Sequence, residues 1–281
     1  MSETGSRSRT LSRVQKVLLA VGGIAAFALI AGTVWTLVNL FGQTTYQRDL
    51  ALTPTAGRLR IDTTGTITIK PGSGPDVRVT ETVRHGLRRP RLTESATADG
   101  LELRAGCDRL TPNCSIDAVV TVPAELTVDA HSSGGDITAS GLTGAVELDS
   151  SGGGITVSGL TGPAQLHSSG GDITASGLAG SARLDSSGGG VRATGLRNAQ
   201  VEARSSGGDV VLAFDTAPDR VVAESSGGGV RIGLPRVEGG YRVNADSSGG
   251  GTHTDVPTDP QSQRQIEAHS SGGDVRLETT G

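Results

Sequence analysis

Histidine, serine and aspartate recur together in the hexapeptide His-Ser-Ser-Gly-Gly-Asp, which begins at His131, His167 and His269. These are the residue types of a nucleophilic triad, in which a histidine activates a serine hydroxyl and a carboxylate orients the histidine. An active site is a single constellation, whereas this grouping is repeated, with Arg204 in place of the histidine in one copy. The sequence patterns GxSxG, HExxH and the Walker loop are absent from the sequence. We therefore expect no catalytic residues, no cofactor and no enzyme activity.

The same histidines and aspartates are also potential metal ligands. In a stack of repeats His131 and His167 would lie two strand spacings apart, about 9.6 Å, which Zn–N bonds of about 2.1 Å cannot span. Calcium-binding nonapeptides place Gly and Asp differently, and only half of the copies here end in Asp. Solvated turn carboxylates are the favoured interpretation, and we expect no metal site.

The elements that position these residues form an internal repeat. Ser-Ser-Gly-Gly begins at eight positions, with spacings that widen from 18 to 23 residues: Ser132, Ser150, Ser168, Ser186, Ser205, Ser225, Ser247 and Ser270. Within each repeat a nine-residue unit combines a short strand of alternating apolar and polar residues with a Gly-containing turn. Two such strands per coil predict an all-β, parallel β-solenoid of about 18-residue coils. An up-and-down meander is the alternative, but it gives no reason for identical corners at 18-residue intervals.

The corner sequence itself has a structural explanation. Successive glycines permit a positive φ at a sharp bend, and serine hydroxyls bond to nearby backbone groups. We expect the first serines to stack in one column. The predicted structural corner residues are Ser132, Gly134, Gly135, Ser150, Gly152, Gly153, Ser168, Gly170, Gly171, Ser186, Gly188 and Gly189.

Charge follows the corners in a regular way. We call the residue before Ser-Ser-Gly-Gly the leading residue and the residue after it the trailing residue. Every basic leading residue is matched by a trailing Asp, and every acidic one by a trailing Gly. Leading residues alternate in sign through the first six copies, which would keep like charges apart in a stack. We interpret this pattern as charge balancing.

An apolar segment precedes the repeats. Residues 17–41 carry no charge, and as a helix they would span about 37 Å, enough to cross a bilayer core. Arg7, Arg9, Arg13 and Lys16 precede the segment, so the positive-inside rule predicts a cytoplasmic N-terminus and an extracytoplasmic remainder. Trp35 and Tyr46 are expected near the outer interface. A cleaved signal peptide is the alternative, but its apolar region is normally shorter.

The two cysteines, Cys107 and Cys114, flank a Pro-containing turn. An oxidising compartment permits a disulfide between them, with two free thiols as the alternative. Zinc binding is not indicated, since neither cysteine has a further Cys or His ligand nearby in sequence.

Composition agrees with a thin, regular β structure. The chain of 281 residues has 43 Gly and 2% aromatic residues, which argues against a thick globular core. The net charge of −4, with both signs interspersed, gives no support for nucleic-acid binding. We predict a cytoplasmic tail (1–16), a transmembrane helix (17–41), a linker (42–57), an N-terminal β region or cap (58–130) and the repeat solenoid (131–281).

These motifs resemble a known family. The opening RLRIDTTGTITI and the segment VTVPAELTVDAHSSGGDITASGLTG, residues 120–144, are similar to the bacterial putative-adhesin β-strand-repeat proteins, a membrane-anchored domain of unknown function. The resemblance covers about residues 50–281. It implies an exported β-solenoid, sometimes encoded beside envelope-stress regulators, and supplies no catalytic residues.

The sequence thus predicts a single-pass membrane protein whose solenoid is a non-catalytic interaction or scaffold module at the cell envelope. Its expected partners are the membrane, an unidentified protein or envelope polymer, and a second copy bound through an open solenoid edge or the apolar helix. The alternative is an envelope-stress accessory that modulates a membrane signalling partner.

Overall fold

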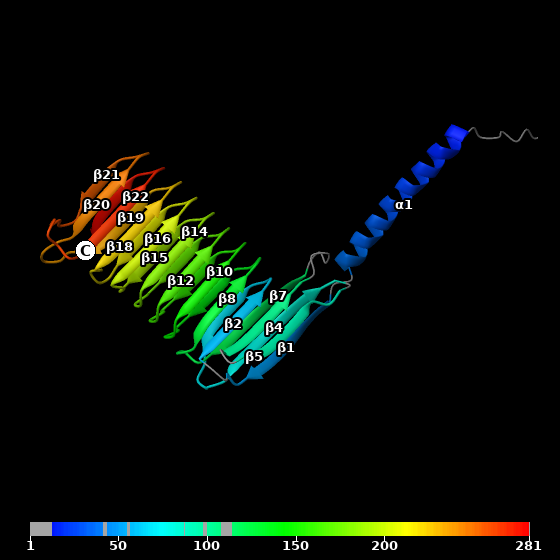
Figure 1. Ribbon diagram of the computed structural model, residues 1–281, viewed down its shortest axis with the longest axis horizontal. Helices are drawn as coiled ribbons and strands as arrows, with labels where there is room; N and C mark the ends of the chain where they lie inside the picture. Colours follow the sequence, from blue (N-terminus) through cyan, green and yellow to red (C-terminus); the bar gives the residue numbers. More distant parts are fainter. Residues whose placement is uncertain are drawn as a thin grey trace, which may run out of the picture.

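The computed structural model describes residues 13–41, 44–54, 57–86, 88–97, 100–107 and 114–280, with helix side chains from 21 to 37. The described β-strands form two facing sheets of mostly parallel strands (Figure 1). Sheet A contains, in spatial order, β1 (Thr44–Leu52), β4 (Val77–His85), β7 (Ser115–Val122), β3 (Ile67–Pro71), β9 (Ile137–Ser140), β11 (Ile155–Ser158), β13 (Ile173–Ser176), β15 (Val191–Leu196), β17 (Val210–Phe214), β19 (Val230–Pro235), β23 (Val275–Thr280) and β21 (Thr252–Asp255).

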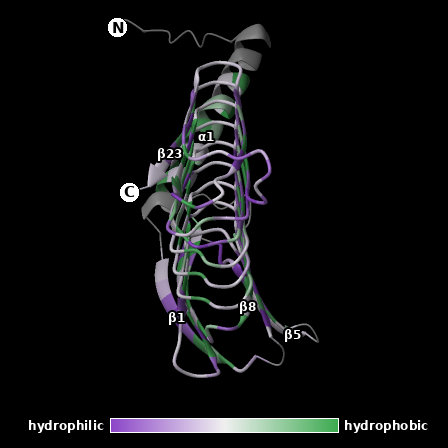
Figure 2. Cartoon of the chain, turned by 90° about the vertical axis from the view of Figure 1, so that its left-hand side faces the viewer, coloured by the Kyte–Doolittle hydropathy of each residue, from purple (hydrophilic) through white to green (hydrophobic). Residues whose placement is uncertain are grey.

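Sheet B faces sheet A across a narrow core. It contains, in spatial order, β20 (Arg242–Ser247), β22 (Gln265–Ser270), β18 (Arg220–Ser225), β16 (Gln200–Ser205), β14 (Ala182–Ser186), β12 (Ala164–Ser168), β10 (Val146–Ser150), β8 (Thr127–Ser132), β2 (Arg58–Thr63), β6 (Gly100–Gly106) and β5 (Arg91–Thr97). Each repeat contributes one strand to each sheet, so consecutive repeats form stacked coils, as the end-on view in Figure 2 shows. The predicted all-β, parallel, repeat architecture is thereby confirmed.

The core is thin and aliphatic because strand alternation turns every second residue inward. Val146 and Leu148 of β10 face Ile155 and Val157 of β11, and all four are at least 97% buried. A leucine near each second corner closes that edge of the core, and these leucines are fully or almost fully buried: Leu142, Leu160, Leu178 and Leu196. Since each coil buries only a few aliphatic side chains, stability comes from the repetition of nearest-neighbour contacts.

The stack does not follow chain order at either end. The last coil in sequence, β22–β23, lies between the coils β18–β19 and β20–β21. At the other end, the coil β6–β7 lies outside the earlier coil β2–β3. The order of the coils in the stack therefore differs from their order along the chain at both ends. The widened C-terminal spacings have a physical reason here: residues 236–241 must pass the position of the last coil, and residues 256–264 must lead back to it.

Antiparallel strands close the N-terminal end. β1 pairs with β4, β4 with β7, and β5 with β6. The linker predicted for residues 42–57 therefore has to be corrected, because Thr44–Leu52 is an edge strand whose Leu50 and Leu52 pack against the core. Tyr46 lies in β1 and not in α1. Its ring lies 5.8 Å from that of His85, edge to face.

The helix α1 (Arg13–Phe41) comes before β1. Its described side chains are exposed, among them Ile24, Phe27 and Trp35. Within the part of the chain that the structure describes, no helix is long and apolar enough to qualify as a membrane span. The predicted cytoplasmic tail, residues 1–16, lies almost wholly outside the described residues.

Candidate functional site

The first serine of each corner joins two coils. The Ser150 hydroxyl donates to the Gly135 carbonyl of the preceding coil (3.0 Å) and accepts from its own Gly153 amide (3.1 Å). The same two bonds recur in the other coils. Register places Ser132, Ser150, Ser168 and Ser186 in a single column. Their hydroxyls are buried and bonded to the backbone, so they are not available as nucleophiles.

The corner glycines are needed for close approach rather than for a positive φ, which corrects the sequence interpretation. A Cβ at Gly153 would lie 2.5 Å from Asp136 Oδ1, and one at Gly171 would lie 2.5 Å from the Gly154 amide nitrogen. The corner glycines are not among those with positive φ. Positive φ, between 62° and 64°, occurs instead at the second corner of each coil, at Gly141, Gly159, Gly177 and Gly195.

The trailing aspartates cap the next coil. Asp136 Oδ1 accepts a hydrogen bond from the Gly154 amide of the following coil (2.8 Å), and the same bond recurs through the stack. Along the stack the trailing residue alternates between Asp and a residue without charge, which is Gly at every position but one. In spatial order the residues are Asp117, Thr66, Asp136, Gly154, Asp172, Gly190, Asp209, Gly229, Asp274 and Gly251. Charge separation alone is therefore an incomplete explanation, because Asp and Gly on successive coils form a donor–acceptor pair.

The terminal pair of this column shows the electrostatic consequence. The Gly251 amide donates to Asp274 Oδ1, and the Arg276 guanidinium lies 3.1 Å from Asp274 Oδ2. Both contacts favour the carboxylate form, the amide bond more strongly, and they hold the pKa of Asp274 below its ordinary value.

The leading residues form a column in which acidic and basic types alternate along the whole stack. In spatial order they are Arg104, Asp62, His131, Asp149, His167, Asp185, Arg204, Glu224, His269 and Asp246. In chain order the alternation fails after Glu224, because Asp246 comes next. Insertion of the last coil between Glu224 and Asp246 restores it. Sequence reasoning missed Arg104 and Asp62 because neither precedes a Ser-Ser-Gly-Gly motif.

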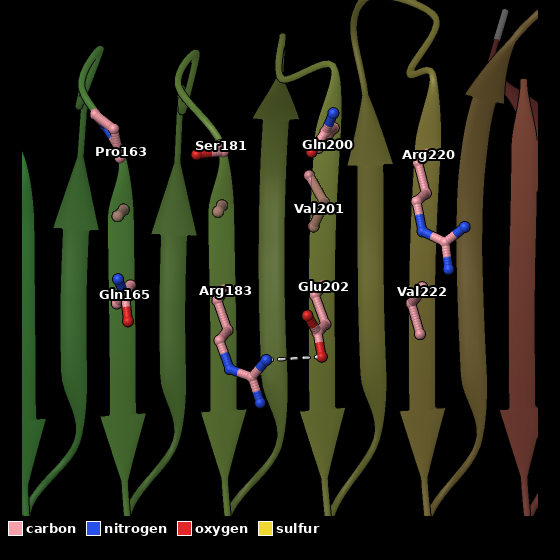
Figure 3. A pocket seen from close by; sticks show the side chains of 11 residues that line it. Pro163, Gln165, Ser181, Arg183, Gln200, Val201, Glu202, Arg220 and Val222 are labelled. Carbon is pink, nitrogen blue, oxygen red and sulfur yellow. Dashed lines mark hydrogen bonds and ion pairs between the residues drawn. The ribbon is translucent and has the colours of Figure 1, made fainter.

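Ion pairs connect the outer face of sheet B. Arg183 reaches Asp185 at 2.8 Å and Glu202 at 2.9 Å, and Arg204 pairs with Glu202 and Glu224. Figure 3 shows the Arg183–Glu202 pair beside a shallow hollow of about 330 Å³ lined by polar and small residues. These pairs are partly exposed, and such pairs contribute little stability individually. The face is a charge-balanced surface without a unique polar cluster.

The N-terminal cap contains the remaining unusual groups. Cys107 and Cys114 form a disulfide with a Cα–Cα distance of 5.9 Å, at the position where later coils have Ser-Ser-Gly-Gly. Arg48 of β1 pairs with Glu94 of β5 at 2.5 Å across the sandwich. Glu81 is buried beside them with Oε2 lacking a hydrogen-bond partner among the described residues, and desolvation raises its pKa, partly offset by Arg48.

Potential metal ligands are dispersed. Among the described residues no group of three or more His, Cys, Asp or Glu side chains is arranged to hold a metal ion. His131 and His167 are separated by Asp149 in the leading column, and His131 Nδ1 lies 3.7 Å from Asp149. The corners thus consist of backbone-bonding groups and alternating surface charges.

The repeated corners and the two-sheet stack lie within a segment that matches a known protein family. Residues 56–278 match the Toastrack DUF4097 family, and the chain belongs to it. The resemblance to putative-adhesin repeat proteins noted from the sequence is confirmed. No curated protein matches the chain.

Solved structures are similar to the chain at low sequence identity. A "putative adhesin" from Bacteroides fragilis is 17% identical with a TM-score of 0.53, covering 84% of this chain and 97% of its own. A "putative adhesin" from Parabacteroides distasonis is 13% identical (TM-score 0.46, covering 83% and 96%). A "putative lipid binding protein" from the same species is 12% identical (TM-score 0.43, covering 83% and 96%). The similarity to the Bacteroides protein establishes the architecture.

Proposed function

We propose that the protein is a non-catalytic interaction module displayed at the cell envelope, with α1 as its membrane anchor. The observation that carries the proposal is the use of the corner groups. The serine hydroxyls of the repeated His-Ser-Ser-Gly-Gly-Asp motif are buried in bonds between coils, and one oxygen of each trailing Asp is bonded to the next coil. What the repeats present to solvent is a long, rigid, charge-patterned surface, suited to binding rather than to chemistry.

Anchoring rests on the sequence of the first helix. The 25 uncharged residues 17–41 follow a basic tail, which predicts a single span with the solenoid outside the cytoplasm. The disulfide at the N-terminal cap suits an oxidising compartment. The similarity to the Bacteroides structure, named a "putative adhesin", supports a surface role, and binding of a protein or an envelope polymer is the proposed activity.

The second candidate is a signalling accessory that uses the basic tail to modulate a membrane partner. It is favoured by the four basic residues within residues 1–16. Deleting residues 1–16, with topology restored by an unrelated basic leader, separates the two functions. Envelope binding should survive the deletion if the solenoid acts by itself. Loss of the cellular phenotype with retained surface display would favour signalling through the tail.

Topology is tested first. Protease added to intact spheroplasts should degrade the solenoid and spare an epitope at the N-terminus. Protection of the solenoid would overturn the proposed location. Crosslinking of the anchored protein in its own envelope then identifies what the displayed surface contacts.

A further inference from the structure

The two ends of the solenoid differ in whether their terminal coils are covered by further strands. At the end next to α1, the antiparallel strands β1, β4 and β5 cover the stack, and the Arg48–Glu94 pair joins the two sheets. At the far end, β20 and β21 are the last strands of sheets B and A (Figure 1). An uncovered strand edge is a template for pairing with another chain, which folded proteins normally block.

The backbone of β20 is open over most of its length. Inside the stack, the Val146 amide donates to the Pro163 carbonyl of the next coil (2.9 Å). Register places Val243 of β20 at the same position, and no coil follows among the described residues. Within the described part of the chain, the backbone covers this edge at Tyr241, which exchanges bonds with Pro257 and Asp259. From Val243 to Ser247 the outward amides and carbonyls have no neighbouring strand among the described residues.

The core is also open at this end. A hollow of about 480 Å³ is lined by three partly buried apolar residues, Val243, Ala245 and Val256, together with polar residues and the loop residues 258–260. On the β21 side, Thr252 and Thr254 take the inward positions that Val275 and Leu277 occupy in β23. These residues belong to the terminal coil, and no further described coil packs against it. Apolar side chains of an added strand would therefore become buried there.

Charge specifies what would fit this end. Each acidic leading residue inside the stack has a basic residue type on both sides, whereas Asp246 has only His269. The next member of the column should therefore be basic. On the trailing side the stack ends in Gly251, after which the alternation requires an Asp.

We propose that this end binds an extended segment of another protein, which adds to β20 as a further strand. Its apolar residues cover the hollow at Val243 and Ala245, and its basic residue lies beside Asp246. The mode is strand addition, in which main-chain bonds give affinity and alternate side chains give specificity. The inference rests on the proposed function of an interaction module, and it identifies the surface and the kind of partner.

The chain supplies its own probe. A peptide of residues 265–280 has the required pattern, with apolar Ile266 and Ala268, basic His269 and trailing Asp274. The matched control is the same peptide carrying His269→Asp. Binding to the full-length protein in detergent micelles is measured by fluorescence anisotropy near pH 6, where a histidine of ordinary pKa is substantially protonated.

We expect the native peptide to bind roughly tenfold or more tightly than the control, because a charge-assisted contact replaces a repulsive one. Asp246→Asn should reduce this preference to near unity, whereas Asp149→Asn, at an internal coil, should leave it unchanged. Ala245→Pro removes an outward edge amide without touching the β22 ladder, and it should weaken both peptides.

Four outcomes overturn the proposal. They are equal binding of the two peptides, binding of neither, a photo-crosslink from the peptide to β18, and self-association of the full chain that Asp246→Asn abolishes. The third indicates exchange with the chain's own last coil, and the fourth indicates a second copy as the occupant. Surface display of the solenoid is measured independently by protease accessibility, so failure here leaves the anchoring proposal to its own test.

Discussion

The column of buried serines offers the most direct test of how the coils are held together. Replacing Ser150 with Ala removes a hydroxyl that is fully buried and makes two bonds. The Gly135 carbonyl and the Gly153 amide then lose their partners, while the shape of the corner is otherwise unchanged. The matched control is Ser151→Ala, at the next residue of the same turn, because the Ser151 side chain is exposed.

The expected magnitude follows from the cost of leaving a backbone group unsatisfied. Each such group costs about 1–3 kcal/mol when buried. Because both groups here are partly exposed and water can reach them, we expect about 2–4 kcal/mol in total. For a domain of this size that corresponds to a decrease in Tm of about 4–16 °C. Ser151→Ala should shift the Tm by less than about 2 °C.

Two measurements check this expectation. Calorimetry or circular dichroism at constant scan rate gives the Tm, and hydrogen exchange reports whether the Gly153 amide loses protection in the folded state. Equal shifts for Ser150→Ala and Ser151→Ala would refute the reasoning. So would an unchanged exchange rate at Gly153, because the serine would then not be the group that satisfies that amide.

Three further predictions concern other parts of the molecule. His269→Asp places a third acidic side chain between Glu224 and Asp246. It should lower the free energy of unfolding by about 1–2 kcal/mol relative to His269→Gln at neutral pH. Equal urea midpoints for the two variants would contradict the alternation argument. Burial raises the pKa of Glu81, so the folded state holds the proton more tightly than the unfolded chain, and stability is lost as the pH rises from the ordinary glutamate range. Glu81→Gln should remove that slope and raise the Tm at neutral pH, and a steeper slope in the variant would count against it. Replacing Cys107 and Cys114 with Ser opens a short loop and should cost about 2 kcal/mol, and the double variant should then unfold identically with and without reductant.

The repeat itself could be read from the sequence because its physics is local. Alternation at Val146, Leu148 and Ser150 determines which side chains turn inward. A Gly-containing corner every nine residues predicts a stack of short strands. The family resemblance rested on the same residues.

Corner chemistry was only partly predictable. Sequence reasoning assigned the Ser-Ser-Gly-Gly glycines to a positive φ, but close contact with the neighbouring coil is what excludes a side chain, as at Gly153. A contact between residues 18 positions apart has no local signature. The bond from the Gly154 amide to Asp136 was missed for the same reason.

The sequence by itself determined the strand period, the facing of each strand and the pairing of basic leading residues with trailing aspartates, since all of these depend on nearest neighbours along the chain. Only the tertiary structure decided the order of the coils. With the last coil inserted between Glu224 and Asp246, and with Arg104 placed beside Asp62, the alternation of charge continues along the entire leading column. The physical reason is that stacked side chains interact across space at one strand spacing, and the chain reaches the order in which opposite charges meet by letting its end loops cross a neighbouring coil.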